Sequence, residues 1–201
     1  MHLNLGFLAS HNGSSMRAIV KAIGEARLDA SARVVISNNP TSPALAFAKE
    51  HGMPALHLSA TKCGGEMECD RGIVDALETH GADIVVLSGY MRKLGPETLH
   101  RFRGRILNIH PGPLPRFGGQ GMYGRHVHEA VIAAGEKTSG ITIHLVDEQY
   151  DQGPIVAKCE VRVDDGDTAE TLAARVQALE PEFFVTTLQQ IASGAIELPR
   201  S

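Results

Sequence analysis

Residues 83–110, DIVVLSGYMRKLGPETLHRFRGRILNIH, contain two apolar segments with one short helical segment between them. The first apolar segment, Asp83–Ser88, has the nearly continuous hydrophobic character of a strand that is covered on both faces of a sheet. Pro96 is suited to the first turn of a helix, which we expect to continue to Phe102. Arg105–Ile109 is the second expected strand. This order predicts a parallel βαβ unit.

The same alternation continues on both sides of this unit. We expect further strands at residues 3–8, 33–37, 54–58, 140–146 and 155–163. We expect further helices at residues 14–27, 44–51, 66–80, 125–134 and 168–193, the last with a bend or a break at Pro181. Only a short loop, Asp147–Pro154, separates the last two strands, which favours an antiparallel pair. The sequence therefore predicts a single α/β domain over residues 1–201, with a mostly parallel, open twisted sheet flanked by helices and an antiparallel strand near its C-terminal end.

The composition argues against several classes of function. The net charge is −4 and no basic stripe occurs, so nothing favours binding of nucleic acid. No apolar run approaches the roughly 18–20 residues that span a bilayer, and residues 1–8 lack a signal-peptide pattern, so we expect a cytoplasmic protein without membrane contact. The three cysteines form no C-x-x-C motif, which favours reduced thiols. The ten histidines fit no zinc-binding spacing, so we expect no metal.

Asn108 and His110 are two residues apart at the end of a predicted strand, so both side chains point to the same face. A carboxamide and an imidazole in this arrangement offer a hydrogen-bond donor for a developing oxyanion and a titratable proton carrier. On its own, such a pair is more often a buried strand histidine with a hydrogen-bonded asparagine partner. The pair is therefore a catalytic candidate that needs support from the rest of the chain.

The loop between the first strand and the first helix contains Gly13, Ser14 and Ser15. Gly13 permits a close approach of the backbone to a ligand, and the two serines can cap the helix. Free amides and the helix dipole at such a position favour an anion. The loop matches neither G-x-G-x-x-G nor a Walker motif, so we expect a monophosphate rather than a dinucleotide or ATP. A plain tight turn is the alternative interpretation.

Asp151 lies in the acidic loop Asp147–Pro154 between the last two predicted strands. Such loops are often only solvated turns. If Asp151 reaches His110 at one end of the sheet, its charge favours the imidazolium and raises the pKa of His110. The three residues Asn108, His110 and Asp151 include no strong nucleophile. They suit attack by a substrate amine on an acyl group, with the protein stabilising charge and moving protons.

Nearly the whole chain resembles the phosphoribosylglycinamide formyltransferases, folate-dependent enzymes of purine synthesis. The resemblance is carried by the segments Asn12–Ser15, Ser88–Arg92, Leu107–Pro111, Leu114–Pro115 and Asp151–Pro154, with Arg175-Val176-Gln177 and Glu180 on the last helix. It implies a Rossmann-like formyltransferase domain with a phosphate-binding N-terminal half and a catalytic and folate-binding C-terminal half. It implies that 10-formyltetrahydrofolate is the formyl donor, as a co-substrate, and that glycinamide ribonucleotide is the acceptor.

The resemblance also assigns roles to individual residues. It implies that Asn108 and His110 hold the formyl group and stabilise the tetrahedral intermediate, that His110 donates a proton, and that Asp151 raises the pKa of His110. The residues implied to bind the ribonucleotide are Gly13, Ser14, Ser15, Gln177 and Glu180. The residues implied to bind folate are Met91, Arg92, Lys93, Leu94 and Asn108. A homodimer is left open.

Three features depart from the family pattern. Glu66 stands where many members have an arginine that helps to hold the folate, and Lys62 is a candidate replacement. Lys93 stands where an apolar residue is usual. The glycine-rich loop Gly118–Gly124 is longer than in the commonest bacterial form, and it is either a mobile flap or a tolerated surface insertion.

Two alternative functions remain open from the sequence. The first is another enzyme with the same catalytic core: a formyltetrahydrofolate deformylase, or a formyltransferase that acts on methionyl-tRNA or an amino sugar. These relatives usually carry further domains or are longer, so we expect them less. The second is a nucleotide- or folate-binding module without catalysis, which the presence of Asn108, His110 and Asp151 disfavours.

Overall fold

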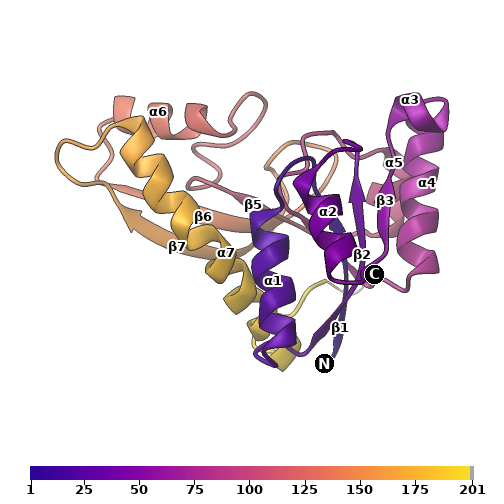
Figure 1. Cartoon of the computed structure of the whole chain (residues 1–201). Helices are drawn as coiled ribbons and strands as arrows, with labels where there is room; N and C mark the ends of the chain where they lie inside the picture. Colours follow the sequence, from indigo (N-terminus) through magenta and orange to yellow (C-terminus); the bar gives the residue numbers. More distant parts are fainter. Residues whose placement is uncertain (200–201) are drawn as a thin grey trace.

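The computed structural model of the chain describes residues 1–199 and contains a sheet flanked by helices (Figure 1). The described strands form one seven-stranded sheet in the order β3-β2-β1-β4-β5-β6-β7. Their bounds are β1 Leu3–Leu8, β2 Ala30–Ser37, β3 Ala55–His57, β4 Ile84–Leu87, β5 Ile106–His110, β6 Thr138–Leu145 and β7 Ile155–Arg162. Strands β1 to β5 pair in parallel, whereas β6 pairs antiparallel with both β5 and β7. The predicted fold class is confirmed.

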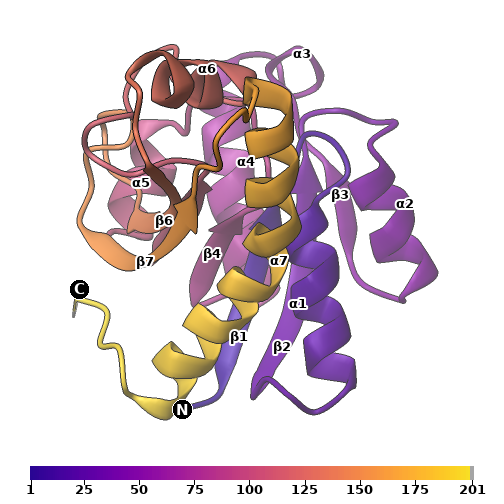
Figure 2. The same ribbon diagram turned by 90° about the vertical axis from the view of Figure 1, so that its left-hand side faces the viewer.

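Helices cover both faces of the sheet (Figures 1 and 2). Their bounds are α1 Ser14–Gly24, α2 Pro43–Glu50, α3 Ala60–Cys63, α4 Glu66–Thr79, α5 Pro96–Arg101, α6 Arg125–Ala133 and α7 Ala169–Ser193. Apolar side chains of α1, α2 and α7 pack against β1 and β2 in one core cluster. Side chains of α4 and the residues around α5 pack against the opposite face in a second cluster. This two-sided cover explains why β4, with its sequence IVVL, is apolar at every position and fully buried.

A third apolar cluster lies at the C-terminal end of the sheet. It joins α6 and the first half of α7 to β6 and β7, and it contains Phe117 from the loop after β5. Because Phe117 is only 6% exposed, this cluster anchors the chain shortly after His110. The loop that follows β5 is therefore held at its start by core packing.

The strand order creates a switch point between β1 and β4. From β1 the chain proceeds outward to β2 and β3, and it then returns to the other side of β1 as β4 and β5. The loops after β1 and β4 consequently leave the carboxyl edge of the sheet in different directions. In open parallel sheets, ligands bind in the crevice at such a point.

Several boundaries differ from the sequence predictions. The helix expected at 14–27 ends at Gly24, because Ala26 adopts a positive φ of 56° and the amides of Arg27 and Leu28 both donate to the carbonyl of Ala22. Strand β2 begins at Ala30, earlier than expected, and the short helix α3 was not predicted. Strand β5 includes His110. Helix α7 is assigned without a break through Pro181.

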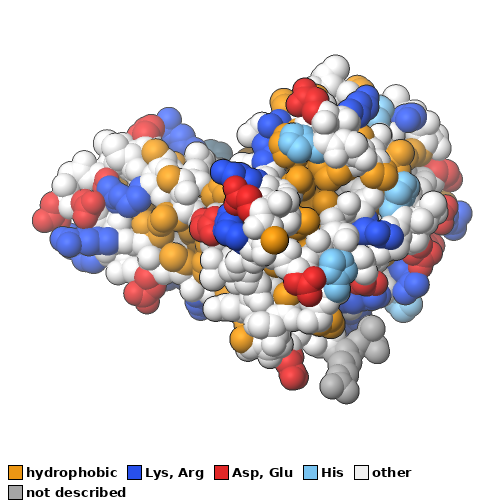
Figure 3. Space-filling model, turned by 60° about the horizontal axis from the view of Figure 1, so that its bottom comes forward, with side chains coloured by type: hydrophobic (Ala, Val, Ile, Leu, Met, Phe, Trp, Pro, Cys, Tyr) orange, Lys and Arg blue, Asp and Glu red, His pale blue; other side chains and the backbone are white. Residues whose placement is uncertain are grey.

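On the face shown in Figure 3, basic and acidic side chains are interspersed. None of the helices within residues 1–199 is both long enough and apolar enough to cross a membrane. The predicted division of the domain into a phosphate-binding half and a catalytic half stays a prediction.

Candidate functional site

A cavity of about 690 Å³ lies at the carboxyl ends of β1, β4 and β5. This volume is within the range of about 300–1,000 Å³ that is usual for small-molecule sites. All residues to which the resemblance assigned a catalytic, ribonucleotide-binding or folate-binding role line it: Gly13, Ser14, Ser15, Met91, Arg92, Lys93, Leu94, Asn108, His110, Asp151, Gln177 and Glu180. The structure therefore brings together segments that are separated by more than half of the chain.

One end of the cavity is formed by the loop after β1 and the start of α1. Gly13 is the N-cap residue of α1, with a φ of 65°, and no side chain caps the helix. The expectation that Ser14 and Ser15 cap it is therefore wrong. The amide of Met16 donates to Ser88 Oγ at 3.0 Å, whereas the amides of Ser14 and Ser15 have no acceptor within residues 1–199. Free first-turn amides favour an anion at this end.

His110 and Asp151 meet at the other end. His110 Nδ1 lies 3.5 Å from Asp151 Oδ2, and the histidine is only 3% exposed. His110 Nε2 donates to the carbonyl of Phe117 at 2.7 Å. The amide of Gly119 donates to Asp151 Oδ2 at 3.0 Å. The chain segment 117–119 is thus hydrogen-bonded to both members of the pair.

His144 belongs to the same cluster, although the sequence did not nominate it as a catalytic residue. It lies on β6 directly opposite Asn108 in the antiparallel ladder. His144 Nδ1 donates to the carbonyl of Leu145 at 2.9 Å, and its Nε2 lies 3.1 Å from Asn108 Nδ2. Asp151 Oδ1 lies 3.4 Å from the same His144 nitrogen. His144 therefore orients the carboxamide of Asn108, and only the β5–β6 register reveals it.

The electrostatics of the cluster follow from its burial. Burial lowers the pKa of His110 below its ordinary value, while the charge of Asp151 and the bond to Phe117 act in the opposite direction. Asp151 therefore acts in the expected sense, but it does not raise the pKa of His110 above the ordinary value. Burial alone would raise the pKa of Asp151, yet its contacts with His144, the Gly119 amide and His110 together hold that pKa below its usual range. At neutral pH the cluster accordingly holds an ionised Asp151 beside a mostly neutral His110.

Gln177 and Glu180 enter the cavity from α7. Burial raises the pKa of Glu180 to about 7. A carboxyl group with this pKa changes its charge near neutral pH. Its ability to accept hydrogen bonds from a ligand therefore depends on pH in that range.

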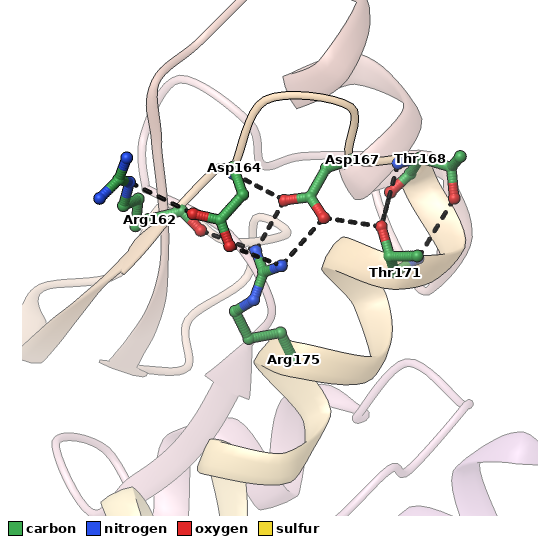
Figure 4. A network of polar contacts seen from close by, with 6 residues as sticks. All are labelled: Arg162, Asp164, Asp167, Thr168, Thr171 and Arg175. Atoms are coloured by element: carbon green, nitrogen blue, oxygen red, sulfur yellow. Dashed lines mark hydrogen bonds and ion pairs between the residues drawn. The ribbon is translucent and has the colours of Figure 1, made fainter.

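A polar network fixes the start of α7 (Figure 4), and one of its members, Arg175, lies two residues before Gln177. Asp167 accepts two bonds from the guanidinium of Arg175, at 2.7 and 2.9 Å, and a third from Thr171 Oγ1 at 2.7 Å. The pKa of Asp167 is held well below its usual range, chiefly by Arg175. Asp164 adds an ion pair with Arg175 at 3.0 Å, and Arg175 also donates to the carbonyl of Arg162 at 2.9 Å. Thr168 completes a capping box with Thr171. The end of β7 and the first turns of α7 are thereby joined.

The segment nominated for folate is tied to the loop after β1. Ser10 Oγ accepts the amide of Met91 at 2.8 Å and donates to Asn38 Oδ1 at 2.6 Å. Leu94 is buried, whereas Arg92 and Lys93 are exposed at the cavity. Lys93 Nζ lies 5.8 Å from the centre of the Tyr150 ring.

Of the features that depart from the family pattern, two residues lie outside the cavity and the glycine-rich loop lies along it. Glu66 and Lys62 do not line the cavity, and Lys62 Nζ instead donates to the carbonyl of His57 at 2.9 Å. Residues 119–124 of the glycine-rich loop do line it. Whether the loop moves stays a prediction. Within residues 1–199, no group of three or more His, Cys, Asp or Glu side chains is arranged to hold a metal ion.

Comparison with known proteins gives consistent matches. Residues 3–188 match the family model described as formyl transferase. The chain is 33% identical to phosphoribosylglycinamide formyltransferase of Bacillus subtilis (strain 168) over 183 residues, which cover 91% of each protein. It is 38% identical to the chloroplastic protein of that name from Vigna unguiculata over 194 residues, or 96% of this chain. The crystal structure of the protein of that name from Brucella melitensis is 36% identical, with a TM-score of 0.87 over 99% of this chain and 100% of that one.

The matched proteins differ in length. The chain spans 62% of the Vigna unguiculata protein and 66% of its Arabidopsis thaliana counterpart.

Proposed function

Because this chain belongs to the formyl transferase family, we propose that it is a phosphoribosylglycinamide formyltransferase. It transfers the formyl group of 10-formyltetrahydrofolate to the amine of glycinamide ribonucleotide, a step of purine biosynthesis. The observation that carries this proposal is one cavity with two chemically different ends. One end presents the free amides of Ser14 and Ser15, and the other presents Asn108, His110 and Asp151.

The two ends suit the two substrates. The phosphate of the ribonucleotide binds at Gly13, Ser14 and Ser15, where amide groups and the helix dipole favour an anion. Gln177 and Glu180 face the rest of the ribonucleotide from α7. The folate lies along Met91–Leu94, which places its formyl group near Asn108. No metal is required in this scheme.

The reaction follows from these positions. The amine attacks the formyl carbon, a C–N bond forms, and the carbonyl oxygen becomes an oxyanion that the Asn108 carboxamide stabilises. The bond between the formyl carbon and N10 of the folate then breaks. One proton must pass from the attacking amine to N10, and His110 carries it. A mostly neutral His110 can take up this proton, and the ionised Asp151 stabilises the imidazolium that results.

His110 must change one contact before it can act. Its Nε2 donates to the carbonyl of Phe117, which points this nitrogen into the protein. When a substrate atom replaces this carbonyl, the ring proton is carried on Nδ1 beside Asp151, and the lone pair of Nε2 is then free to take up the proton of the amine. The bond between the Gly119 amide and Asp151 couples the same segment to the carboxylate.

The test is turnover of the purified protein with 10-formyltetrahydrofolate, in the presence and absence of glycinamide ribonucleotide. We expect formyl transfer that requires the ribonucleotide, and a loss of about 10²–10⁴-fold in His110→Ala. Release of formate at the same rate without the ribonucleotide would instead identify a deformylase. Binding of both ligands without turnover would identify a binding module.

A further inference from the structure

Arg17, on the second turn of α1, joins the loop after β1 to α2. Its Nε donates to the carbonyl of Asn12 at 2.8 Å, and its Nη2 donates to the carbonyl of Pro43 at 3.0 Å. Its guanidinium also lies over the ring of Phe47, 4.6 Å from the centre. Arg17 is not among the residues that line the cavity.

The four consecutive carbonyls of residues 10–13 all accept hydrogen bonds from the protein. Those of His11 and Gly13 accept the backbone amides of Ala44 and Arg17, at 3.0 and 2.9 Å. The carbonyl of Ser10 accepts Asn39 Nδ2 at 3.4 Å. Among the described residues, the carbonyl of Asn12 accepts only from the guanidinium of Arg17.

The direction of each carbonyl determines the direction of the following amide. A trans peptide is planar, so its N–H points opposite to its C=O. The Arg17 bond to the Asn12 carbonyl therefore sets the direction of the Gly13 amide. Within residues 1–199, the amides of Asn12, Gly13, Ser14 and Ser15 have no acceptor. Successive free amides of this kind form a concave site for an anion.

The Asn12–Gly13 peptide would be able to rotate without the bond from Arg17. Gly13 has a φ of 65° and no Cβ, so rotation of the preceding peptide meets little steric resistance from this residue. A rotated peptide would present a carbonyl oxygen, rather than an amide, to the phosphate. The fork of a guanidinium can hold this carbonyl and that of Pro43 together, because it is planar and has several donors.

We propose that Arg17 is a positioning residue for the phosphate of the acceptor substrate: it fixes the Asn12–Gly13 peptide with its amide available to the anion. This inference rests on the proposed function for the identity of the acceptor. It adds a residue outside the cavity to those that determine affinity for a phosphorylated ligand. Its effect is on binding of the phosphate end and not on the chemistry at His110.

Arg17→Met is the test variant, because it keeps a long apolar side chain over Phe47. We expect the KM for glycinamide ribonucleotide to rise about tenfold, equivalent to about 1.4 kcal/mol, with kcat and the folate KM changed less than twofold. Arg17→Lys offers a point charge instead of a fork, so its KM for glycinamide ribonucleotide should lie between those of the wild type and Arg17→Met. Arg105→Met is the matched control. Arg105 is also partly buried, donates to the carbonyl of Arg101 at 2.7 Å and lies 5.4 Å from the centre of the Phe102 ring, but it does not line the cavity.

A second measurement does not depend on turnover. Inorganic phosphate is titrated into the 15N-labelled protein, and the amide signals of Gly13, Ser14 and Ser15 are followed. We expect saturable shifts in the wild type and in Arg105→Met, and weaker binding in Arg17→Met. This result would support the role of Arg17 even if formyl transfer were not observed.

Two results would overturn the inference while leaving the proposed function intact. One is normal formyl transfer with an unchanged ribonucleotide KM in Arg17→Met. The other is an equal rise of both KM values in Arg17→Met, which marks a general structural defect. Absence of phosphate binding at Gly13–Ser15 in the wild type would also overturn it. If Arg17→Met does not fold, the same comparisons are made with Arg17→Lys.

Discussion

Asp151→Asn removes one negative charge from the catalytic end of the cavity and changes the side-chain size very little. Asp151 has a φ of 57°, and asparagine tolerates this left-handed conformation well. The substituted carboxamide oxygen can still accept the amide of Gly119, as Asp151 Oδ2 does at 3.0 Å. The substitution therefore tests the charge of Asp151 more than its shape.

The size of the effect follows from the distance between His110 and Asp151. Unit charges separated by the observed 3.5 Å interact by about 5 kcal/mol at an effective dielectric constant of about 20. A fraction of this energy stabilises the partial charge on His110 while the proton is in transfer. Each 1.36 kcal/mol corresponds to a factor of ten, so we expect kcat to fall by about 10²–10³-fold.

The pH dependence should change in a defined direction. The pKa of His110 is already lowered by burial, and the charge of Asp151 acts against this effect. Without that charge the pKa falls further. Because His110 takes up a proton in the proposed mechanism, turnover is lost as pH falls through its pKa. The acidic limb of the kcat profile should therefore move to lower pH in Asp151→Asn, with a lower plateau.

The assay is kcat at saturating concentrations of both substrates over pH 5–9, with thermal unfolding as a check on folding. Asp165→Asn is the control, because the side chain of Asp165 is 95% exposed and pairs with the exposed Lys137. A folded Asp151→Asn protein that keeps kcat within fivefold of the wild type would refute the proposed pairing. An acidic limb that stays at the same pH would refute the assignment of that limb to His110.

Three further predictions concern other parts of the cavity. Gly13→Val places a Cβ 3.1 Å from Met16 Cε and 3.3 Å from Ala44 Cβ at a positive φ. It should therefore lower the free energy of unfolding by about 1–3 kcal/mol and raise the KM for the ribonucleotide. A rise in the KM for folate alone would show that folate, and not the ribonucleotide, binds at Gly13. Glu180→Gln should flatten the pH dependence of stability: between the ordinary pKa of 4.5 and about 7 the wild type retains a proton that the unfolded chain has lost, so its stability falls with rising pH, by up to about 3 kcal/mol. Parallel urea-unfolding results at pH 5 and pH 8 for Glu180→Gln and the wild type would contradict this. The loop at residues 118–124 should become more protected from amide exchange when both substrates bind, and equal protection in both states would leave it no role as a flap.

The fold class was predictable because its signals are local. The apolar run 84–87, the helix start at Pro96 and the glycine at position 13 each describe their own segment, and the structure places strands and helices at these positions. The helix predicted to reach Arg27 ends earlier because its last turn depends on backbone bonds to Ala22 and not on side-chain periodicity. The exact end of a helix depends on local backbone structures that differ little in free energy.

The chemistry of the site was only partly predictable. The spacing of Asn108 and His110 placed both on one strand face, and the acidic loop 147–154 offered Asp151 as a partner, a role that the family resemblance also implied. His144 has no comparable signal, because its relation to Asn108 exists only through the register of β5 against β6. The same is true of the Phe117 carbonyl, which reaches His110 Nε2 only because Phe117 is packed in the C-terminal core cluster.

The sequence by itself therefore determined which segments are strands and helices, the parallel character of the sheet, and the residue types available for phosphate binding and proton transfer. The tertiary structure decided that the loops after β1, β4 and β5 share one cavity, that burial lowers the pKa of His110, and that Arg17 reaches two carbonyls on different segments. The physical reason is the range of the interactions. Periodicity and capping act between neighbours along the chain, whereas strand order, register and desolvation depend on residues that meet only after folding.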